Sequence, residues 1–295
     1  MSILADIRST FSRRDNALNQ LLVINVLVFV ALNLLRAVFY LATGNSFGHM
    51  LVLEWLAVPS APLTFLVRPW TLLTYSFTQF SFFHILFNLL NLYWFGTLVR
   101  EYLGDRRLIS LYVLGAVAGA ACYLACYNLL PAMRHQSAML YGASASVTAI
   151  IVAAATLLPD YTFNLIFIGP VRIKYIAAVV VVVSIAGISG DNTGGQLAHL
   201  GGALLGFVYI RQLQRGRDLG RPIIAMGEWV NALLHGRPRL RVSHRSAQAA
   251  PNGKRGPLAQ PAQEEIDRIL EKISRSGYES LSKEEKQKLF KASQQ

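Results

Sequence analysis

Residues 141–146 read Tyr-Gly-Ala-Ser-Ala-Ser, and they stand where a long apolar stretch begins. The stretch continues to Leu158 and contains no charged side chain. An uncharged run of this length, opened by small residues, is typical of a helix inside a membrane. Ser144 lies in its first turn, where a serine is either a small packing residue or a nucleophile. The rest of the chain decides between these two readings.

The composition is that of a polytopic membrane protein. Of the 295 residues 53% are hydrophobic and only 15% are charged, and the mean hydropathy is +0.39. Soluble domains have about a quarter of their residues charged. The net charge of +12 arises from 28 basic and 16 acidic residues, and much of the excess follows Ile210. That position suits contact with anionic lipid and the topology rules of membrane proteins better than nucleic-acid binding.

Six apolar runs are expected to cross the membrane, which predicts an all-α bundle. Each approaches the roughly 20 residues that a spanning helix needs. Their ranges are 21–41, 82–99, 108–129, 142–158, 172–188 and 196–213. Residues 43–81 are apolar and aromatic but broken by three prolines, so we expect a structured loop in the outer leaflet. Residues 159–171 are expected to form an interfacial connection.

Six spans place both ends of the chain on one side of the membrane. Basic residues gather on that side, so the positive-inside tendency predicts cytoplasmic termini and a multi-pass protein of the inner cell membrane. The expected parts are a cytoplasmic N-terminus (1–19), a membrane core (20–214), a juxtamembrane amphipathic helix with a basic linker (215–262) and a helical tail (263–295). In the tail, Ser282 and Glu285 have the spacing of a capping box.

Ser144 and His199 are expected at matching depth. The spans that carry them both enter from the outer face, and at 1.5 Å per residue each side chain lies within roughly 10 Å of that surface. Three small residues, Gly142, Gly202 and Gly206, are predicted to let the helices near the site pack closely. A serine beside a histidine at this depth suits a nucleophile and its general base.

His84 and Asn88 are four residues apart, so they share one face of the second span near its outer end. Both donate hydrogen bonds, and together with the Ser144 backbone N–H they form the predicted oxyanion site. Each feature alone also has a structural reading, because such residues often link membrane helices. No carboxylate is placed to orient His199, which predicts a dyad rather than a triad. The two cysteines of the chain lack the further ligands of a metal site.

This pattern resembles the rhomboid family of intramembrane serine proteases. The resemblance covers about residues 20–214 and rests on His84-Ile-Leu-Phe-Asn88, Gly142-Ala-Ser144 and Ala198-His199-Leu-Gly-Gly202 with Gly206. It implies a six-helix bundle with a cavity open to the outside and cleavage of transmembrane protein substrates near the outer face, without a cofactor. It also implies that Ser144 is the nucleophile, that His199 is the general base and acid, and that His84, Asn88 and the Ser144 amide bind the oxyanion.

The chain departs from the family's pattern at Thr71, at Thr148 and before Gly104, where the acidic residue is shifted. Thr71 follows Trp70 where an arginine is common, so the role of that arginine is either absent or supplied by Arg68. Thr148 stands where an aromatic ring often packs against the histidine. The tail from Gln263 is similar to tails of some Bacteroidetes-type rhomboids, and its partner is unknown.

Two other classes of protein compete with a protease. A non-catalytic rhomboid-like protein that binds membrane segments is expected to have lost the serine or the histidine, and both are present. A small transporter is expected to show inverted repeats, which we do not find. The sequence therefore favours an intramembrane serine endopeptidase that acts on transmembrane substrates in contact with lipid, with no role for nucleic acid.

Overall fold

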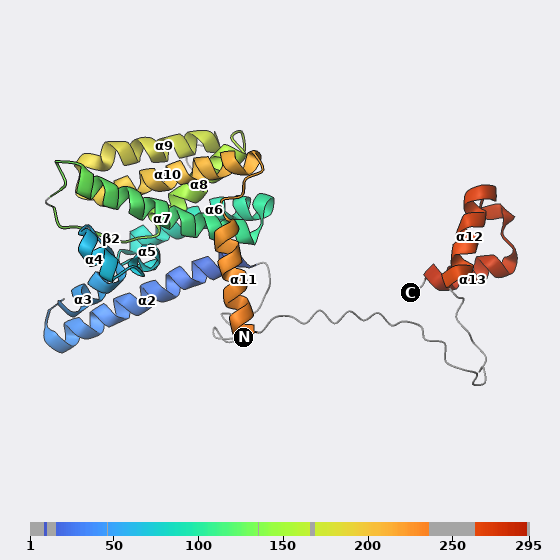
Figure 1. Ribbon diagram of the computed structural model, residues 1–295, viewed down its shortest axis with the longest axis horizontal. Coiled ribbons are helices and arrows are strands. Elements are labelled where there is room, and N and C mark those ends of the chain that lie inside the picture. The colour runs from blue at the N-terminus through green and yellow to red at the C-terminus, as the bar shows by residue number, and fades with distance from the viewer. Residues whose placement is uncertain are drawn as a thin grey trace. The chain divides into compact units, whose positions relative to one another are not determined.

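The computed structural model describes residues 9–10, 16–45, 47–134, 136–165, 169–235 and 263–293. The chain divides into two compact units, Met1–Pro238 and Arg239–Gln295. The first unit is the helical bundle drawn from blue to orange in Figure 1. The predicted linker, 236–262, and most of the predicted cytoplasmic N-terminus lie outside the described residues.

Six helices occupy the stretches that were expected to span the membrane. They are α2 (Ala17–Thr43), α6 (Phe82–Leu103), α7 (Asp105–Leu129), α8 (Ser144–Leu157), α9 (Ile173–Ala186) and α10 (Thr193–Gln214). Ten of the 14 residues of α8 are buried, and it packs against α6, α7, α9 and α10. Its many alanines allow those neighbours to approach closely. Only three residues of α9 are buried, so α9 lies at the edge of the bundle (Figure 1).

The surface of the bundle is strongly apolar. In the part of the chain that the structure describes, α2, α6 and α7 are long and apolar enough to cross a membrane, and α8 and α9 are shorter apolar helices. On α9, Val179, Val182 and Val183 each expose 58–62% of their surface. A soluble monomer rarely exposes a continuous apolar surface of this extent. The fold is therefore that of a membrane protein.

The loop between α2 and α6 is built from short helices. It contains α3 (Phe47–Leu56), β1 (Val58–Pro59), α4 (Pro62–Val67), α5 (Thr71–Thr74) and the 3₁₀ helix η1 (Tyr75–Phe77). The rings of Trp55 and Trp70 stack with their centres 5.6 Å apart. The Arg68 guanidinium lies 4.6 Å from the centre of the Trp55 ring and donates to the Glu54 carbonyl at 2.8 Å. Arg68 thus braces this first loop from within.

Of the six helices only α6 begins at the expected residue; α2, α7 and α9 begin one to four residues away from the expected ones, and the starts of α8 and α10 have local causes. α8 begins at Ser144 instead of Gly142, because Gly142 has a φ of 124°, outside the helical region. β2 (Met139–Leu140), which precedes this turn, pairs antiparallel with β1. α10 begins at Thr193, because the Asn192 side chain accepts a hydrogen bond from the Gly195 backbone N–H and caps the helix.

The connection between α8 and α9 is a β-hairpin that ends in charged residues. β3 (Thr162–Leu165) pairs antiparallel with β4 (Gly169–Arg172). Asp160 lies 2.7 Å from the Lys174 ammonium and 3.3 Å from Arg172. The hydrogen bond and the charge of Lys174, with Arg172, hold the pKa of Asp160 below its usual value. A cluster of exposed charges requires water, so this end of α8 lies at a membrane surface.

A second ion pair fastens α7 to the segment after α10. Arg107 Nε donates to one oxygen of Asp218 at 2.9 Å. The other oxygen accepts from the Tyr209 hydroxyl at 3.2 Å and from the Gly220 N–H at 2.8 Å. Partial burial would raise the pKa of Asp218, but these donors outweigh it and hold the pKa below its usual value.

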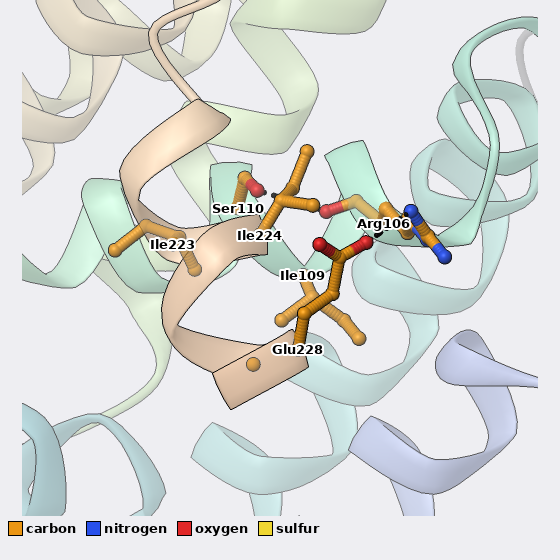
Figure 2. Close-up of a pocket in the computed structure, with 7 residues that line it drawn as sticks. Arg106, Ile109, Ser110, Ile223, Ile224 and Glu228 are labelled. Carbon is orange, nitrogen blue, oxygen red and sulfur yellow. Dashed lines mark hydrogen bonds and ion pairs between the residues drawn. The ribbon is translucent and has the colours of Figure 1, made fainter. Parts of the chain in front are cut away.

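Helix α11 (Arg221–His235) follows this ion pair and crosses the end of the bundle (Figure 1). A pocket of about 240 Å³ lies between α11 and α7, and Figure 2 shows Arg106 and Glu228 pointing toward one another beside it, 2.7 Å apart. α11 also exposes Met226 and Trp229. This distribution fits the amphipathic helix that was predicted to follow the spans.

The second unit is a small helical tail. It contains α12 (Gln263–Ser276), the 3₁₀ helix η3 (Tyr278–Ser280) and α13 (Lys283–Ser293). The predicted capping box is formed, because the Glu285 N–H donates to Ser282 Oγ at 3.3 Å and the Ser282 N–H donates to the Glu285 carboxylate at 2.7 Å. Lys272 lies 3.0 Å from the same carboxylate and joins α12 to α13. The Ser282 N–H and Lys272 hold the pKa of Glu285 below its usual value.

Candidate active site

The turn that precedes α8 is held by the first loop. The Gly142 N–H donates to the Tyr75 carbonyl at 2.9 Å, and the buried Tyr75 hydroxyl donates to the Ala116 carbonyl of α7 at 2.7 Å. Gly142 is also required by space, since a Cβ there would lie 2.8 Å from the His84 ring. This anchored turn leads directly to Ser144, the first residue of α8.

Of the two serines in the opening stretch, Ser144 is the accessible one. Ser146 is fully buried and its hydroxyl has no hydrogen-bond partner among the described residues, whereas Ser144 is half-buried. Ser146 faces Gly115 of α7, where a Cβ would lie 3.0 Å from the Ser146 Cα. Ser146 is therefore a packing residue, and Ser144 is the serine that can meet another molecule.

Helices α7, α8 and α10 converge beside Ser144 and His199. The centre of this convergence is Gly119 of α7, where a Cβ would lie 2.5 Å from the Ala145 Cβ and 3.0 Å from the Ala198 carbonyl oxygen. Ala145 directly follows Ser144 in the chain, and Ala198 directly precedes His199. The residues next to the predicted nucleophile and next to the predicted base therefore both pack against Gly119.

The predicted packing glycines of α10 lie directly against the backbone of α8. A Cβ at Gly202 would run into the Ala145 carbonyl oxygen, and a Cβ at Gly206 would run into the Ala149 carbonyl oxygen. Small residues permit this backbone-to-backbone approach between membrane helices. A larger residue at either glycine would separate α10 from α8 at the site.

His84 and Asn88 lie on α6, which packs against α8 beside Ser144. The His84 ring packs on Gly142, which stands two residues before Ser144. Asn88 is only 7% exposed, and its Nδ2 donates to Gln79 Oε1 at 2.7 Å. The structure thus brings His84 to the site and holds the Asn88 amide through a residue of the first loop.

Ser184 of α9 is a neighbour of His199 that the sequence analysis missed. Its hydroxyl, on a residue 2% exposed, lies 3.2 Å from His199 Nδ1 and donates to the Val180 carbonyl at 2.9 Å. A hydroxyl has one hydrogen, so with that hydrogen on Val180 the oxygen can only accept from Nδ1. We infer that His199 carries its hydrogen on Nδ1 and keeps Nε2 as an acceptor. The only signal in the sequence was a serine within an apolar run, which is usually a packing residue.

Ser144 and His199 lie on neighbouring helices but are not in hydrogen-bond contact in the described residues. No hydrogen bond joins Ser144 to His199 in the described chain, and such bonds are often long or poorly aligned until a substrate binds. The site has a serine at a helix N-terminus, a histidine with an acceptor nitrogen, and donors on α6. This set of groups can perform acyl transfer. Among the described residues no three His, Cys, Asp or Glu side chains are grouped to hold a metal ion.

A hollow of about 410 Å³ opens beside the turn that precedes Ser144. Its lining includes Phe80 and Tyr141, whose rings meet edge-on with centres 6.1 Å apart, and also His49 and Arg36. Tyr141 stands three residues before Ser144, so the hollow adjoins the segment that leads to the candidate nucleophile.

Comparison with known families divides the chain in the same two parts. Residues 67–215 match the family described as Rhomboid domain. This range extends from the first loop to the end of α10 and includes all four predicted side chains of the site, Ser144, His199, His84 and Asn88. Residues 260–295 match a family of unknown function, DUF6576.

Similar proteins occur in plants and in bacteria. The chain is 30% identical over 158 residues to RHOMBOID-like protein 12, mitochondrial, of Arabidopsis thaliana, which covers 50% of this chain and 47% of the relative. It is 38% identical over 93 residues to Rhomboid protease GlpG of Salmonella newport (strain SL254), which covers 31% of this chain and 29% of the relative. The chain thus matches about half or less of the length of these relatives.

Proposed function

The chain belongs to the rhomboid family, whose members are generally intramembrane serine proteases, and on this premise we propose that it is an intramembrane serine endopeptidase. Its proposed substrates are proteins anchored by a transmembrane helix and cut near the outer membrane face. The observation that supports the proposal is the approach of Ala145 of α8 and Ala198 of α10 to Gly119 of α7, because these two alanines are the chain neighbours of Ser144 and His199.

The proposed reaction is acyl transfer to Ser144. Ser144 Oγ attacks the carbonyl carbon of a substrate peptide bond while His199 Nε2 takes the hydroxyl proton. When the tetrahedral intermediate collapses, the C–N bond breaks and His199 returns that proton to the leaving nitrogen. Water then attacks the acyl ester with His199 as its base, which releases the new carboxyl end and restores Ser144.

The oxyanion would form next to the N-terminus of α8. The first N–H groups of a helix have no partner within the helix, and its dipole is positive at this end. The ring of His84 and the amide of Asn88 would add donors from α6. Loss of one such donor typically lowers the rate about 10²- to 10³-fold.

We propose that Ser144 and His199 form a dyad and that an uncharged hydroxyl orients His199 in place of the third residue of a triad. A general base must be oriented, and in serine proteases a third group often does this. Here Ser184 lies at Nδ1 of His199. Thr148, which is buried in α8, stands where relatives often have an aromatic ring. The hydrogen bond of Ser184 would therefore provide orientation that no ring provides.

The proposed orientation in the membrane follows from the charges. The ion pairs of Asp160 and Asp218 both lie in connections that the sequence assigns to the side of the N-terminus. We propose that α2 and α6–α10 are six spans, that both termini lie in the cytoplasm, and that the protein is in the inner cell membrane. A substrate segment would then approach the hollow beside Tyr141 from the outer side.

The alternative is a protein that binds membrane segments without cutting them. It is favoured by one observation, the absence of a Ser144–His199 hydrogen bond in the described chain. Under this reading the convergence of α8 and α10 would serve packing alone, and a substrate helix would bind without turnover.

A fluorophosphonate probe tests the proposal, because it reacts with serines that a neighbouring base activates. The wild type in detergent should be labelled, whereas the Ser144→Ala and His199→Ala variants should not be. Ser146→Ala is the matched control: it removes a serine hydroxyl two residues away that has no partner in the part of the chain that the structure describes, and its labelling should equal that of the wild type. Labelling of Ser144→Ala would refute the assignment of the nucleophile. Binding of a transmembrane substrate in proteoliposomes without cleavage would support the alternative.

A further inference from the structure

A chain of four buried polar side chains runs through the bundle to Asn88. Its members come from α6, from the first loop, from α2 and from α7, and they are Asn88, Gln79, Asn25 and Tyr112. Gln79, Asn25 and Tyr112 are fully buried and Asn88 nearly so. Buried polar groups are costly unless they are hydrogen-bonded, and in this chain each is bonded to the next. Asn88 Nδ2 lies 2.7 Å from Gln79 Oε1, and Gln79 Nε2 lies 3.1 Å from Asn25 Oδ1. Asn25 Nδ2 lies 3.2 Å from the Tyr112 hydroxyl.

Two backbone carbonyls fix the direction of every bond in this chain. Asn25 Nδ2 lies 2.9 Å from the Leu21 carbonyl, and the Tyr112 hydroxyl lies 2.8 Å from the Ser76 carbonyl. A carbonyl oxygen only accepts, so Tyr112 must donate to Ser76 and the nitrogen of Asn25 must face Leu21. The contact between the Tyr112 hydroxyl and Asn25 Oδ1 is longer, at 3.5 Å, and does not compete.

The orientation of Asn25 also determines the orientations of the Gln79 and Asn88 amides. With its nitrogen on Leu21, Asn25 presents Oδ1 to Gln79, so Gln79 must donate with Nε2 and present Oε1 to Asn88. Asn88 therefore faces Gln79 with its NH₂ group and not with its oxygen. That group has two hydrogens, and in the described chain no protein acceptor takes the second one.

We propose that Gln79 is a positioning residue, which holds the Asn88 amide with a free N–H available to the oxyanion, and that Asn25 and Tyr112 fix the orientation of Gln79. The inference rests on the proposed protease function, and it deepens it. If Gln79 did not accept from Asn88, the amide could turn over and present its oxygen to the developing negative charge. The backbone carbonyls of Leu21 on α2 and Ser76 in the first loop would thus determine whether the Asn88 amide presents its N–H or its oxygen to the oxyanion.

The test must separate positioning from packing, because a buried network also holds helices together. We would replace Gln79 by methionine, which is similar in length and has no hydrogen-bonding nitrogen or oxygen, in wild-type and Asn88→Ala backgrounds. Cleavage of a transmembrane substrate in proteoliposomes gives kcat and KM for the four proteins. Melting in detergent identifies a variant that fails to fold.

Gln79→Met should lower kcat about tenfold, less than the loss of a whole donor, and leave KM within about twofold. In the Asn88→Ala background the same change should lower kcat less than about twofold, because the group through which Gln79 acts is absent. An equal fall of kcat in both backgrounds would show a packing role and overturn the inference. An unchanged kcat in the wild-type background would also overturn it.

Tyr112→Phe is the milder variant, to be used if Gln79→Met does not fold. It removes one oxygen at the far end of the network and should lower kcat about threefold, again only when Asn88 is present. Tyr209→Phe is its matched control: Tyr209 is equally buried, and its hydroxyl bonds Asp218 at the other end of the bundle. Equal falls of kcat in the two tyrosine variants would contradict the inference. Failure of the wild type to cleave would instead remove the proposed function itself.

Discussion

Replacement of Gly119 of α7 by alanine should push α8 and α10 away from α7 beside the site. The new Cβ would lie 2.5 Å from the Ala145 Cβ and 3.0 Å from the Ala198 carbonyl oxygen. Carbon atoms that are not bonded rest about 3.5–4.0 Å apart, so α8 must move by about 1 Å. Overpacking of this kind costs about 1–3 kcal/mol of stability. A displacement of about 1 Å between reacting groups can cost about 100-fold in rate.

Gly119→Ala should therefore lower the rate of fluorophosphonate labelling and of substrate cleavage about 100-fold, with a melting temperature in detergent lower by about 5 °C. Gly227→Ala is the control, since Gly227 is also a helical glycine but a Cβ there meets no described atom within 4 Å. That change should leave the labelling rate unaltered and raise stability by about 0.5–1 kcal/mol. Wild-type labelling by Gly119→Ala would refute the reasoning, because the spacing of the helices would then not set the geometry of the site.

Three further predictions concern other contacts. Asp218→Asn should lower the melting temperature at neutral pH. Because Arg107 and the other donors lower the pKa of Asp218, the wild type should have its full stability advantage above about pH 5 and lose it as the pH falls below about 4. Thermal melts of both proteins across this pH range measure that advantage. Ser184→Ala should lower kcat about fivefold, the equivalent of one neutral hydrogen bond of about 1 kcal/mol to His199, and Ser184→Thr should restore most of it; equal rates for Ser184→Ala and the wild type would argue against a role for this contact. Ser282→Ala should destabilise α13 by about 1 kcal/mol, visible as faster amide hydrogen exchange in α13 of the full chain but not in α8.

The sequence contained enough information for the helices and for the placement of Ser144. Long apolar runs predict membrane helices whatever their partners, and each of the six expected runs forms a helix. The capping box of the tail was also predicted correctly, because it depends on two residues three positions apart. The short helices of the first loop were not predicted, since α4 and α5 have only six and four residues, too few to show a helical period.

The contacts that orient the side chains of the site could not be predicted from the sequence for a different reason. Asn25 meets Gln79 across 54 positions of the chain and Tyr112 across 87, so no local pattern connects them. Ser184 meets His199 only because α9 packs beside α10. The roles of these residues and of the predicted dyad remain predictions for the experiments above.

The length of α8 has a consequence for what the site can reach. A helix of 14 residues rises about 21 Å, whereas the hydrocarbon core of a bilayer is about 30 Å thick. In the proposed orientation the charges around Asp160 keep one end of α8 at a membrane surface, and Ser144 at the other end would lie about 9 Å short of the opposite surface. A soluble polypeptide would have to leave water and strip its backbone of hydration to arrive there, while a segment already in the lipid would not. For the proposed protease, depth alone would thus select substrates before any side chain is recognised.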